Sequence, residues 1–174
     1  MKFSVLVPVF NEEKYVGLVI EKLIKLSFVD EIVIVDDGST DNSWRIINDT
    51  IGNKLIRKRL DNNRGKTAAI NEAIKIASGD IFAIQDADLE YDPSELESLV
   101  QLIKDNKADV VYGSRFLVKK ASRVLYFYHY IGNKVITFLS NIFTNLNMTD
   151  IETCYKVFRS PVLKNLGLTS SGFG

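Results

Sequence analysis

Asp86 and Asp88 stand one residue apart at the end of the apolar run Ile81–Gln85. The run has the composition of a buried β-strand, and a strand that ends there can turn both carboxylates toward one point. Two carboxylates at one point repel each other unless a cation lies between them. A divalent cation in that position would bind a diphosphate group. The same spacing arises about once by chance in a chain of this aspartate content, so the site prediction depends on the surrounding elements.

A second pair of acids, Asp36 and Asp37, precedes Gly38 and Ser39 after another apolar run. A carboxylate at a strand end can accept hydrogen bonds from a nucleotide base or from ribose hydroxyls. The same residues also suit a plain strand-to-helix turn with an Asx or capping role. The pattern alone favours neither interpretation.

Lys66 lies at the start of a predicted helix, in the segment 61–67 with the sequence DNNRGKT. The segment has some likeness to a phosphate-binding loop but lacks the first glycine, so we do not predict a P-loop. A lysine at a helix start can still contact a phosphate. A solvated lysine is an equally good interpretation of this residue.

Three later residues supply further chemistry. Arg115 follows Gly113 and Ser114 directly after a predicted strand, and its guanidinium suits two-point contact with a phosphate. Asp150 comes from a late segment and supplies the carboxylate that a general base requires. His129 is the only histidine and stands in an aromatic segment, where packing is the commoner role.

Length and composition exclude several classes of protein. The chain has 174 residues, enough for one domain with a sizeable core, which we expect to span residues 1–174. It carries 22 basic and 22 acidic residues, so its bulk charge gives no indication of a nucleic-acid partner. The single cysteine, Cys154, excludes a disulfide framework and a cysteine-based zinc site. We expect no cleavable signal, because the first apolar run contains Pro8, and no uninterrupted apolar run is long enough to predict a bilayer crossing.

Apolar runs alternate with helical periodicities along the first part of the chain. Near-continuous apolar strands separated by amphipathic helices predict an α/β fold, a three-layer α/β/α sandwich with a mainly parallel sheet. Ligands of such sheets bind beyond the carboxyl ends of the strands, where the acids above fall. We also expect Asn11 to cap the first helix, and the charged strand 54–59 to lie at an edge. The predicted strands are Phe3–Val9, Glu31–Asp36, Lys54–Arg59, Ile81–Gln85 and Asp109–Tyr112, and the predicted helices are 16–23, 43–50, 65–77 and 92–103.

The organisation changes after Arg115. A basic stretch with Lys119, Lys120 and Arg123 precedes the aromatic segment Val124–Leu146. This segment is too polar to cross a membrane and predicts one or two amphipathic helices. These helices would either cover the sheet as ordinary core helices or lie in a membrane interface. We therefore expect residues 119–147 to form an amphipathic subregion that faces an acceptor or a membrane.

Six segments occur in a fixed order along the chain: VPVFNE at 7–12, VDDGSTD at 35–41, NRGK at 63–66, DADLE at 86–90, GSRF at 113–116 and DIETCYKVFR at 150–159. In this order and at these spacings the chain resembles the inverting family 2 glycosyltransferases, which have the GT-A nucleotide-diphospho-sugar fold. Within the family it is most similar to the dolichyl- and polyprenyl-phosphate sugar transferases. The resemblance covers essentially the whole chain.

The resemblance implies roles for individual residues. Asp86 and Asp88, with Glu90 helping, would hold a Mg²⁺ or Mn²⁺ ion and the diphosphate. Arg115 would contact a phosphate of donor or acceptor, and Asp150 would lie near the acceptor as a base or as an orienting group. The expected nucleotide-binding residues are Pro8, Phe10, Glu12, Asp37, Lys66, Asp86 and Ala87, and the expected contacts of an acceptor phosphate are Arg115, Arg123, His129 and Asn133.

The resemblance also implies an activity: inverting transfer of a hexose from a UDP- or GDP-linked sugar to a polyprenyl or dolichyl phosphate. Such an enzyme would be a metal-dependent hexosyltransferase, peripheral at the cytoplasmic face of a membrane. Relatives continue past the point where this chain stops, so we expect it to be truncated at the C-terminus.

Other activities stay open. One is transfer to a saccharide hydroxyl in polysaccharide or glycan synthesis, with Asp150 as the base. Another is a non-catalytic module that binds sugar nucleotides. A nucleotidyltransferase would carry a glycine-rich loop after its first strand, and the segment 8–12 has no glycine.

Overall fold

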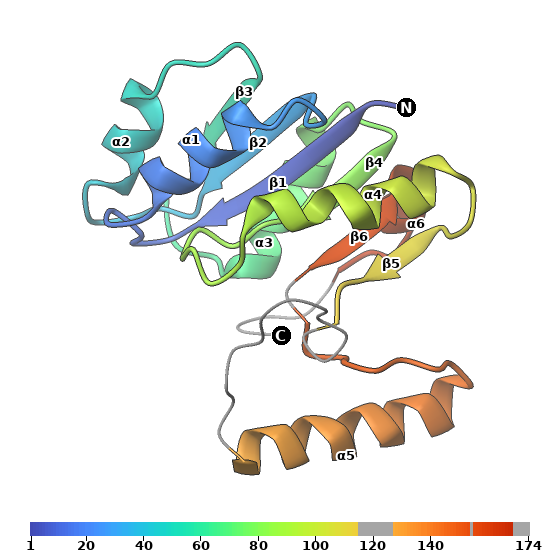
Figure 1. Ribbon diagram of the computed structural model, residues 1–174. Helices are drawn as coiled ribbons and strands as arrows, with labels where there is room; N and C mark the ends of the chain where they lie inside the picture. The colour runs from blue at the N-terminus through green and yellow to red at the C-terminus, as the bar shows by residue number, and fades with distance from the viewer. Residues whose placement is uncertain (115–126, 154, 169–174) are drawn as a thin grey trace.

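The computed structural model describes residues 1–114, 127–153 and 155–168 of the chain. Its centre is a six-stranded sheet with the strand order β3-β2-β1-β4-β6-β5 (Figure 1). The strands β1 to β5 share one direction, and β6 is antiparallel to its neighbours β4 and β5. The mainly parallel sheet predicted from the sequence is thus confirmed. The strands are β1 Phe3–Val9, β2 Glu31–Asp36, β3 Leu55–Arg59, β4 Ile81–Ile84, β5 Val110–Tyr112 and β6 Lys156–Arg159.

The sheet is covered on both faces, which explains why its strands are apolar on both sides. Alternate residues along β1 belong to two separate cores, with Val5 and Val7 in one and Leu6 in the other. The helices α1 (Val16–Lys25), α2 (Ser43–Asp49) and α4 (Leu96–Lys104) cover the first core, and α3 (Lys66–Ile76) and α6 (Ser160–Asn165) cover the second (Figure 1). The predicted three-layer α/β/α sandwich is confirmed.

The sheet contains one edge strand that was predicted and one inner strand that was not. The charged strand β3 lies at an edge, as predicted. The strand β6, only four residues long, was not predicted. It nevertheless has the alternation of a two-sided strand, since Val157 joins one core and Phe158 the other. Because β6 lies between β4 and β5, its alternate side chains can pack into the cores on both faces of the sheet.

The prediction that Asn11 caps the first helix is wrong. The helix α1 begins four residues after Glu12, at Val16, without a side-chain cap. Asn11 adopts a left-handed backbone conformation with φ 55°. Its side-chain oxygen accepts a hydrogen bond from the Thr40 amide at 2.8 Å. Asn11 therefore joins the loop after β1 to the loop after β2 at the carboxyl edge of the sheet.

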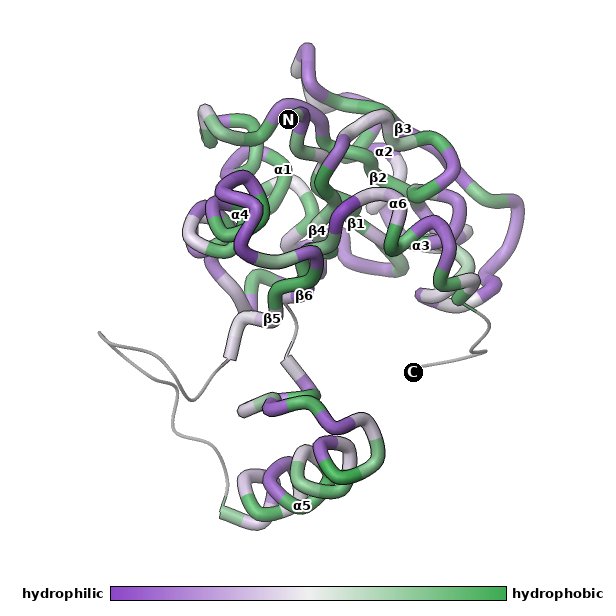
Figure 2. The backbone as a smooth tube through the Cα atoms, turned by 90° about the vertical axis from the view of Figure 1, so that its right-hand side faces the viewer, coloured by the Kyte–Doolittle hydropathy of each residue, from purple (hydrophilic) through white to green (hydrophobic). Residues whose placement is uncertain are grey.

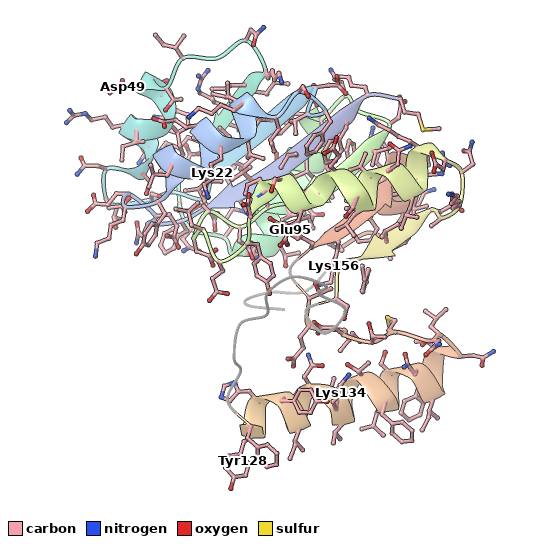
Figure 3. All side chains as sticks on the ribbon, viewed as in Figure 1. Lys22, Asp49, Glu95, Tyr128, Lys134 and Lys156 are labelled. Carbon is pink, nitrogen blue, oxygen red and sulfur yellow. The ribbon has the colours of Figure 1, made fainter. Side chains whose placement is uncertain are left out.

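The helix α5 (Phe127–Thr144) stands apart from the sheet (Figures 1 and 2). It buries polar residues, Asn133 and Thr137, and turns its apolar side chains outward. Tyr128 is 83% exposed and points away from the sheet (Figure 3), and Phe143 is 85% exposed. The interpretation of this segment as an ordinary core helix is therefore wrong. Among the helices that the structure describes, none has the combined length and hydropathy that a membrane crossing requires.

The polar side chains on the buried face of α5 form hydrogen bonds with the chain segment that follows the helix. The segment 147–152 lies between α5 and the sheet in both views (Figures 1 and 2). The Asn141 amide exchanges two hydrogen bonds with the backbone of Met148, at 2.8 and 2.9 Å. The Ile151 amide donates to the Thr137 hydroxyl at 3.2 Å. The polar stripe thus follows the helical i, i+4 spacing and leaves the apolar side chains on the opposite face.

Candidate active site at the carboxyl edge of the sheet

The site lies where the strand order reverses. The strands β2 and β3 extend the sheet on one side of β1, and β4 returns to the other side. In sheets of this kind ligands bind beyond the carboxyl ends of the strands at that switch point. The register pairs Val9 with Asp36 and Leu6 with Ile84. The segments that follow β1, β2 and β4 therefore all begin at the carboxyl-terminal end of the sheet. Glu12, Asp37 and Asp86, which follow these three strands, therefore come from the same end of the sheet.

The two aspartates after β4 lie on one side of the chain. The Gln85 amide still donates to the Leu6 carbonyl at 2.9 Å, so the chain stays extended up to this point. Ala87 is buried in the core, whereas Asp86 and Asp88 on either side of it are half-exposed. The chain leaves β4 at Ile84 and turns at Ala87 and Asp88, so Ala87 enters the core while both carboxylates stay partly accessible. Leu89, with φ 60°, then reverses the chain in a conformation that is uncommon for a non-glycine residue.

Lys66 contacts the first of these aspartates. The lysine is the first residue of α3, and its Nζ lies 2.6 Å from Asp86 Oδ1. Both residues were predicted to bind the nucleotide, and the structure brings them into direct contact. Phe10 and Glu12 follow β1 at the same edge, and Phe10 is exposed, while Pro8 is buried within the strand.

Asp37 has a role that the sequence did not predict. Its carboxylate is buried and accepts hydrogen bonds from the Arg64 and Gly65 amides, at 2.9 and 2.8 Å. A Cβ on Gly38 would lie 2.6 Å from the carbonyl carbon of Asn62, so only glycine lets this turn pack against the loop 61–65. Asp37 therefore anchors the loop that leads into Lys66. Each oxygen keeps a second lone pair, and the contact of Asp37 with a base or ribose stays a prediction.

The site has an excess of negative charge. The pKa of Glu12 is raised by burial first and then by the negative charges of Asp88, Asp41 and Asp86. A bound cation would relieve this repulsion, so the donor set fits a divalent metal ion. Within the described parts of the chain, no three His, Cys, Asp or Glu residues are grouped closely enough to enclose a metal. Two carboxylates would then share the ion with phosphate oxygens and water, the arrangement that Mg²⁺ favours.

Glu90 was expected to help the aspartate pair. Its side chain is exposed, and its backbone amide donates to Asp88 Oδ1 at 2.9 Å. The contact orients the Asp88 carboxylate. A role of the Glu90 carboxylate as a metal ligand stays a prediction.

Two residues that support the site were missed. The Tyr155 hydroxyl donates to Gln85 Oε1 at 2.9 Å, and Gln85 Nε2 donates to the Asp86 carbonyl at 2.9 Å. The Tyr155 ring also packs edge-on against Tyr91, with 5.2 Å between centroids. The sequence carried one signal for this network, an amide side chain at the end of an apolar strand, because a buried amide needs hydrogen-bond partners.

The predicted acceptor side is built on α5. Asp150 is 1% exposed, and its Oδ1 accepts a hydrogen bond from the Asn133 amide at 2.8 Å. The same amide donates to Glu152 at 3.1 Å. These contacts favour Asn133 as a positioning residue for Asp150, and its contact with an acceptor phosphate stays a prediction. His129 is exposed near the start of α5, whereas Arg115 and Arg123 lie outside the described residues.

Comparison with known proteins identifies relatives that are similar in sequence. The model of glycosyl transferase family 2 matches residues 4–167. Dodecaprenyl-phosphate galacturonate synthase from Rhizobium johnstonii is 29% identical over 97% of this chain and 51% of its own length. Undecaprenyl-phosphate 4-deoxy-4-formamido-L-arabinose transferase from Proteus mirabilis is 30% identical over 93% of this chain and 50% of its own length. The chain thus spans about half the length of these curated relatives.

Solved structures share the fold. S. aureus TarS 1-349 in complex with UDP-GlcNAc superposes with a TM-score of 0.65 at 26% identity, covering 94% of this chain and 47% of that one. M. tuberculosis glucosyl-3-phosphoglycerate synthase with Mn²⁺, UDP-glucose and phosphoglyceric acid has a TM-score of 0.70 at 20% identity, covering 93% and 57%, which supports the fold alone. Since the family match covers nearly the whole chain and these neighbours share its GT-A architecture, the chain belongs to glycosyl transferase family 2.

Proposed function

We propose that the chain transfers a hexosyl group from a UDP- or GDP-linked sugar to a polyprenyl or dolichyl phosphate, with inversion at the anomeric carbon. The observation that carries the choice of acceptor is α5, which buries its polar face against the segment that contains Asp150 and exposes its aromatic face on the other side. A lipid acceptor requires such a surface, whereas a soluble sugar does not. Relatives that are named for polyprenyl-phosphate substrates support the same choice.

The donor half of the proposal rests on the carboxyl edge of the sheet. Phe10 and Glu12 after β1, together with Asp37 after β2, would bind the nucleoside. Asp86 and Asp88 would hold a Mg²⁺ or Mn²⁺ ion, which would neutralise charge on the departing diphosphate. The Lys66 ammonium lies 2.6 Å from Asp86 and would supply a positive charge for a phosphate at that place.

The proposed reaction is a single displacement. An oxygen of the acceptor phosphate attacks the anomeric carbon and forms a new C–O bond. The bond from that carbon to the diphosphate breaks, and its electron pair leaves with the nucleoside diphosphate. A phosphate is already anionic near neutral pH, so no proton has to be removed from it. Asp150 would then orient the acceptor rather than act as a base.

Membrane contact is part of the proposal. The apolar face of α5 runs along an 18-residue helix, about 27 Å long, and would lie in the boundary between headgroups and acyl chains. Lys119, Lys120 and Arg123 precede the helix in sequence, and each would add about 1 kcal/mol of attraction to an anionic surface. The chain would then be peripheral at the cytoplasmic face of the membrane.

A transfer assay tests the proposal. The chain is mixed with vesicles that contain polyprenyl phosphate and with a panel of UDP- and GDP-linked sugars, in Mg²⁺, Mn²⁺ or EDTA. We expect one sugar nucleotide to yield a lipid-linked sugar phosphate of inverted anomeric configuration, with little product in EDTA. Transfer to a soluble saccharide alone would contradict the lipid acceptor. Nucleotide binding without any turnover would instead support a binding module.

A further inference from the structure

Lys66 and Asp86 form an ion pair where the proposed metal ion would bind. Their Nζ and Oδ1 atoms are 2.6 Å apart, and the side chains are 38% and 17% exposed. Asp86 is also one of the two carboxylates assigned to the metal. A divalent cation and an ammonium group repel each other, so the two cannot both contact the same carboxylate at low cost. One of them has to leave when the other arrives.

We propose that Lys66 is an internal counter-ion, which occupies Asp86 in the empty site and moves to the diphosphate when the nucleotide binds. The metal ion then gains access to Asp86 only together with the nucleotide. This inference rests on the proposed metal-dependent nucleotide site and adds an order to its assembly. It assigns to Lys66 a positioning role that differs from that of a simple phosphate contact.

The backbone around Lys66 is held in place. The amides of Arg64 and Gly65 donate to the buried Asp37 carboxylate, and the loop 61–65 rests on Gly38. Lys66 therefore starts from a fixed Cα at the beginning of α3. Its four-carbon stem is half-exposed and can rotate. A fixed base with a mobile tip lets the ammonium exchange one oxygen partner for another without moving the fold.

The charges of the site favour such an exchange. Asp88 and Glu12 add further negative charge beside this pair, and the pKa of Glu12 is raised first by burial and then by the charges of Asp88, Asp41 and Asp86. A nucleoside diphosphate brings more negative charge and offers the ammonium new oxygens. It also lies near the amino end of α3, which is favourable for an anion. Metal and nucleotide should therefore bind cooperatively, each raising the affinity for the other by one common factor.

Mn²⁺ binding tests this inference, with free Mn²⁺ measured by electron paramagnetic resonance. Wild-type chain is compared with Lys66→Met, with Lys66→Arg, and with Lys75→Met as a matched control. Lys75 lies on the same helix and pairs with Glu72 at 2.7 Å, so its loss removes equal charge away from the site. Thermal unfolding of each variant confirms that it is folded.

Without nucleotide, Lys66→Met should bind Mn²⁺ about tenfold more tightly than wild type, because Asp86 has lost its competitor. Lys66→Arg and Lys75→Met should stay within about twofold of wild type. With UDP or GDP added, wild type should show a large gain in Mn²⁺ affinity, and Lys66→Met a much smaller one.

Equal Mn²⁺ affinities for wild type and Lys66→Met without nucleotide would overturn the inference. An equal gain for Lys75→Met would also overturn it, since bulk charge would then explain the effect. A wild-type chain that binds Mn²⁺ neither alone nor with nucleotide would contradict the proposed metal-dependent function itself. The two failures are thus distinguishable.

Discussion

The side-chain amide of Asn133 lies 2.8 Å from a carboxylate oxygen of Asp150. The helix that exposes its apolar face therefore also positions the acid beside it. Thr137 reinforces this contact, because its hydroxyl donates to the Asn133 carbonyl oxygen at 3.2 Å. The buried side of α5 thus holds Asp150 through one amide, while the opposite side of the helix carries its exposed apolar residues.

Asn133→Ala should impair transfer without weakening nucleotide binding. The variant removes a hydrogen bond to a charged group, which is worth about 1.5–3 kcal/mol, so turnover at saturating donor should fall by about ten- to a hundredfold. The dissociation constant of UDP or GDP, measured by calorimetry, should stay unchanged. Asn141→Ala is the matched control, because Asn141 lies on the same helix face but bonds Met148. Equal losses in both variants would indicate general damage to α5.

Nucleotide binding should require a divalent cation held by Asp88. EDTA and Asp88→Ala should each weaken UDP or GDP strongly, because the diphosphate then faces uncompensated carboxylates. Calorimetric titrations with and without Mn²⁺ measure the effect. Asp49→Ala removes an exposed acid on α2 and should leave binding unchanged. Equal affinity of wild type in metal and in EDTA would refute the cation bridge.

Asp37→Asn should weaken nucleoside diphosphate and sugar nucleotide alike, by about 1–3 kcal/mol. The asparagine replaces one acceptor oxygen by an NH₂ group, which cannot accept from the amides of Arg64 and Gly65. The loss should therefore be the same whether or not a sugar is attached. Asp61→Asn, an exposed change in the same loop, serves as the control. A variant that loses only the sugar nucleotide would show that Asp37 contacts the sugar.

Charged substitutions on the apolar face of α5 should release the chain from vesicles. Phe138→Asp and Phe143→Asp place a carboxylate where burial in lipid is expected, so sedimentation with anionic liposomes should drop. Ile51→Asp is the control, because Ile51 is 94% exposed but lies outside α5. Binding of wild type should fall in part, not wholly, as salt rises, since only the basic residues are screened. No sedimentation of wild type at any salt would contradict membrane docking.

Glu31 should make stability depend on acid pH. Burial alone would raise its pKa, but hydrogen bonds from Ser4, Ser78 and Lys2 outweigh burial and lower the pKa from 4.5 to about 2. The carboxylate is therefore favoured in the folded chain, and its contribution, about 3 kcal/mol, is complete above pH 5 and is lost as the pH falls toward 2.

Glu31→Gln should flatten the change in the free energy of unfolding between pH 6 and pH 3, measured by urea titration. A residual slope should remain from Glu72, whose pKa is also lowered to about 2 by Lys58 and Lys75. Glu21→Gln, on the exposed side of α1, should keep the wild-type slope. An unchanged slope in Glu31→Gln would show that the buried cluster does not control acid stability.

The sequence by itself determined the first part of the fold and the place of its acids in that fold. The strands up to Ile84 follow from apolar runs, most of them near-continuous, the helices between them follow a period of 3.6 residues, and the acids stand at strand ends in a fixed order. Parallel connection then places the acids that follow β2 and β4 at the same end of the sheet. Such signals are local, so they can be read without knowing what packs against what.

Where a side chain had several possible partners, only the tertiary structure decided which one it contacts. The Asn11 side chain could cap a helix or bond a neighbouring loop, and in the structure it accepts a hydrogen bond from the Thr40 amide. Lys66 could point into solvent or pair with an acid, and the loop 61–65 on Asp37 places it in contact with Asp86. Likewise the segment of β6 is a strand because it pairs with β4 on one side and with β5 on the other.

The orientation of α5 was decided in the same way. Its sequence has an apolar face that fits either a core or a membrane, because amphipathicity alone does not say what the face contacts. The segment 147–152 satisfies the polar stripe around Asn133 and so turns the apolar side chains away from the sheet. That long-range pairing is set by the fold, and it determines which surface of α5 is left for a partner.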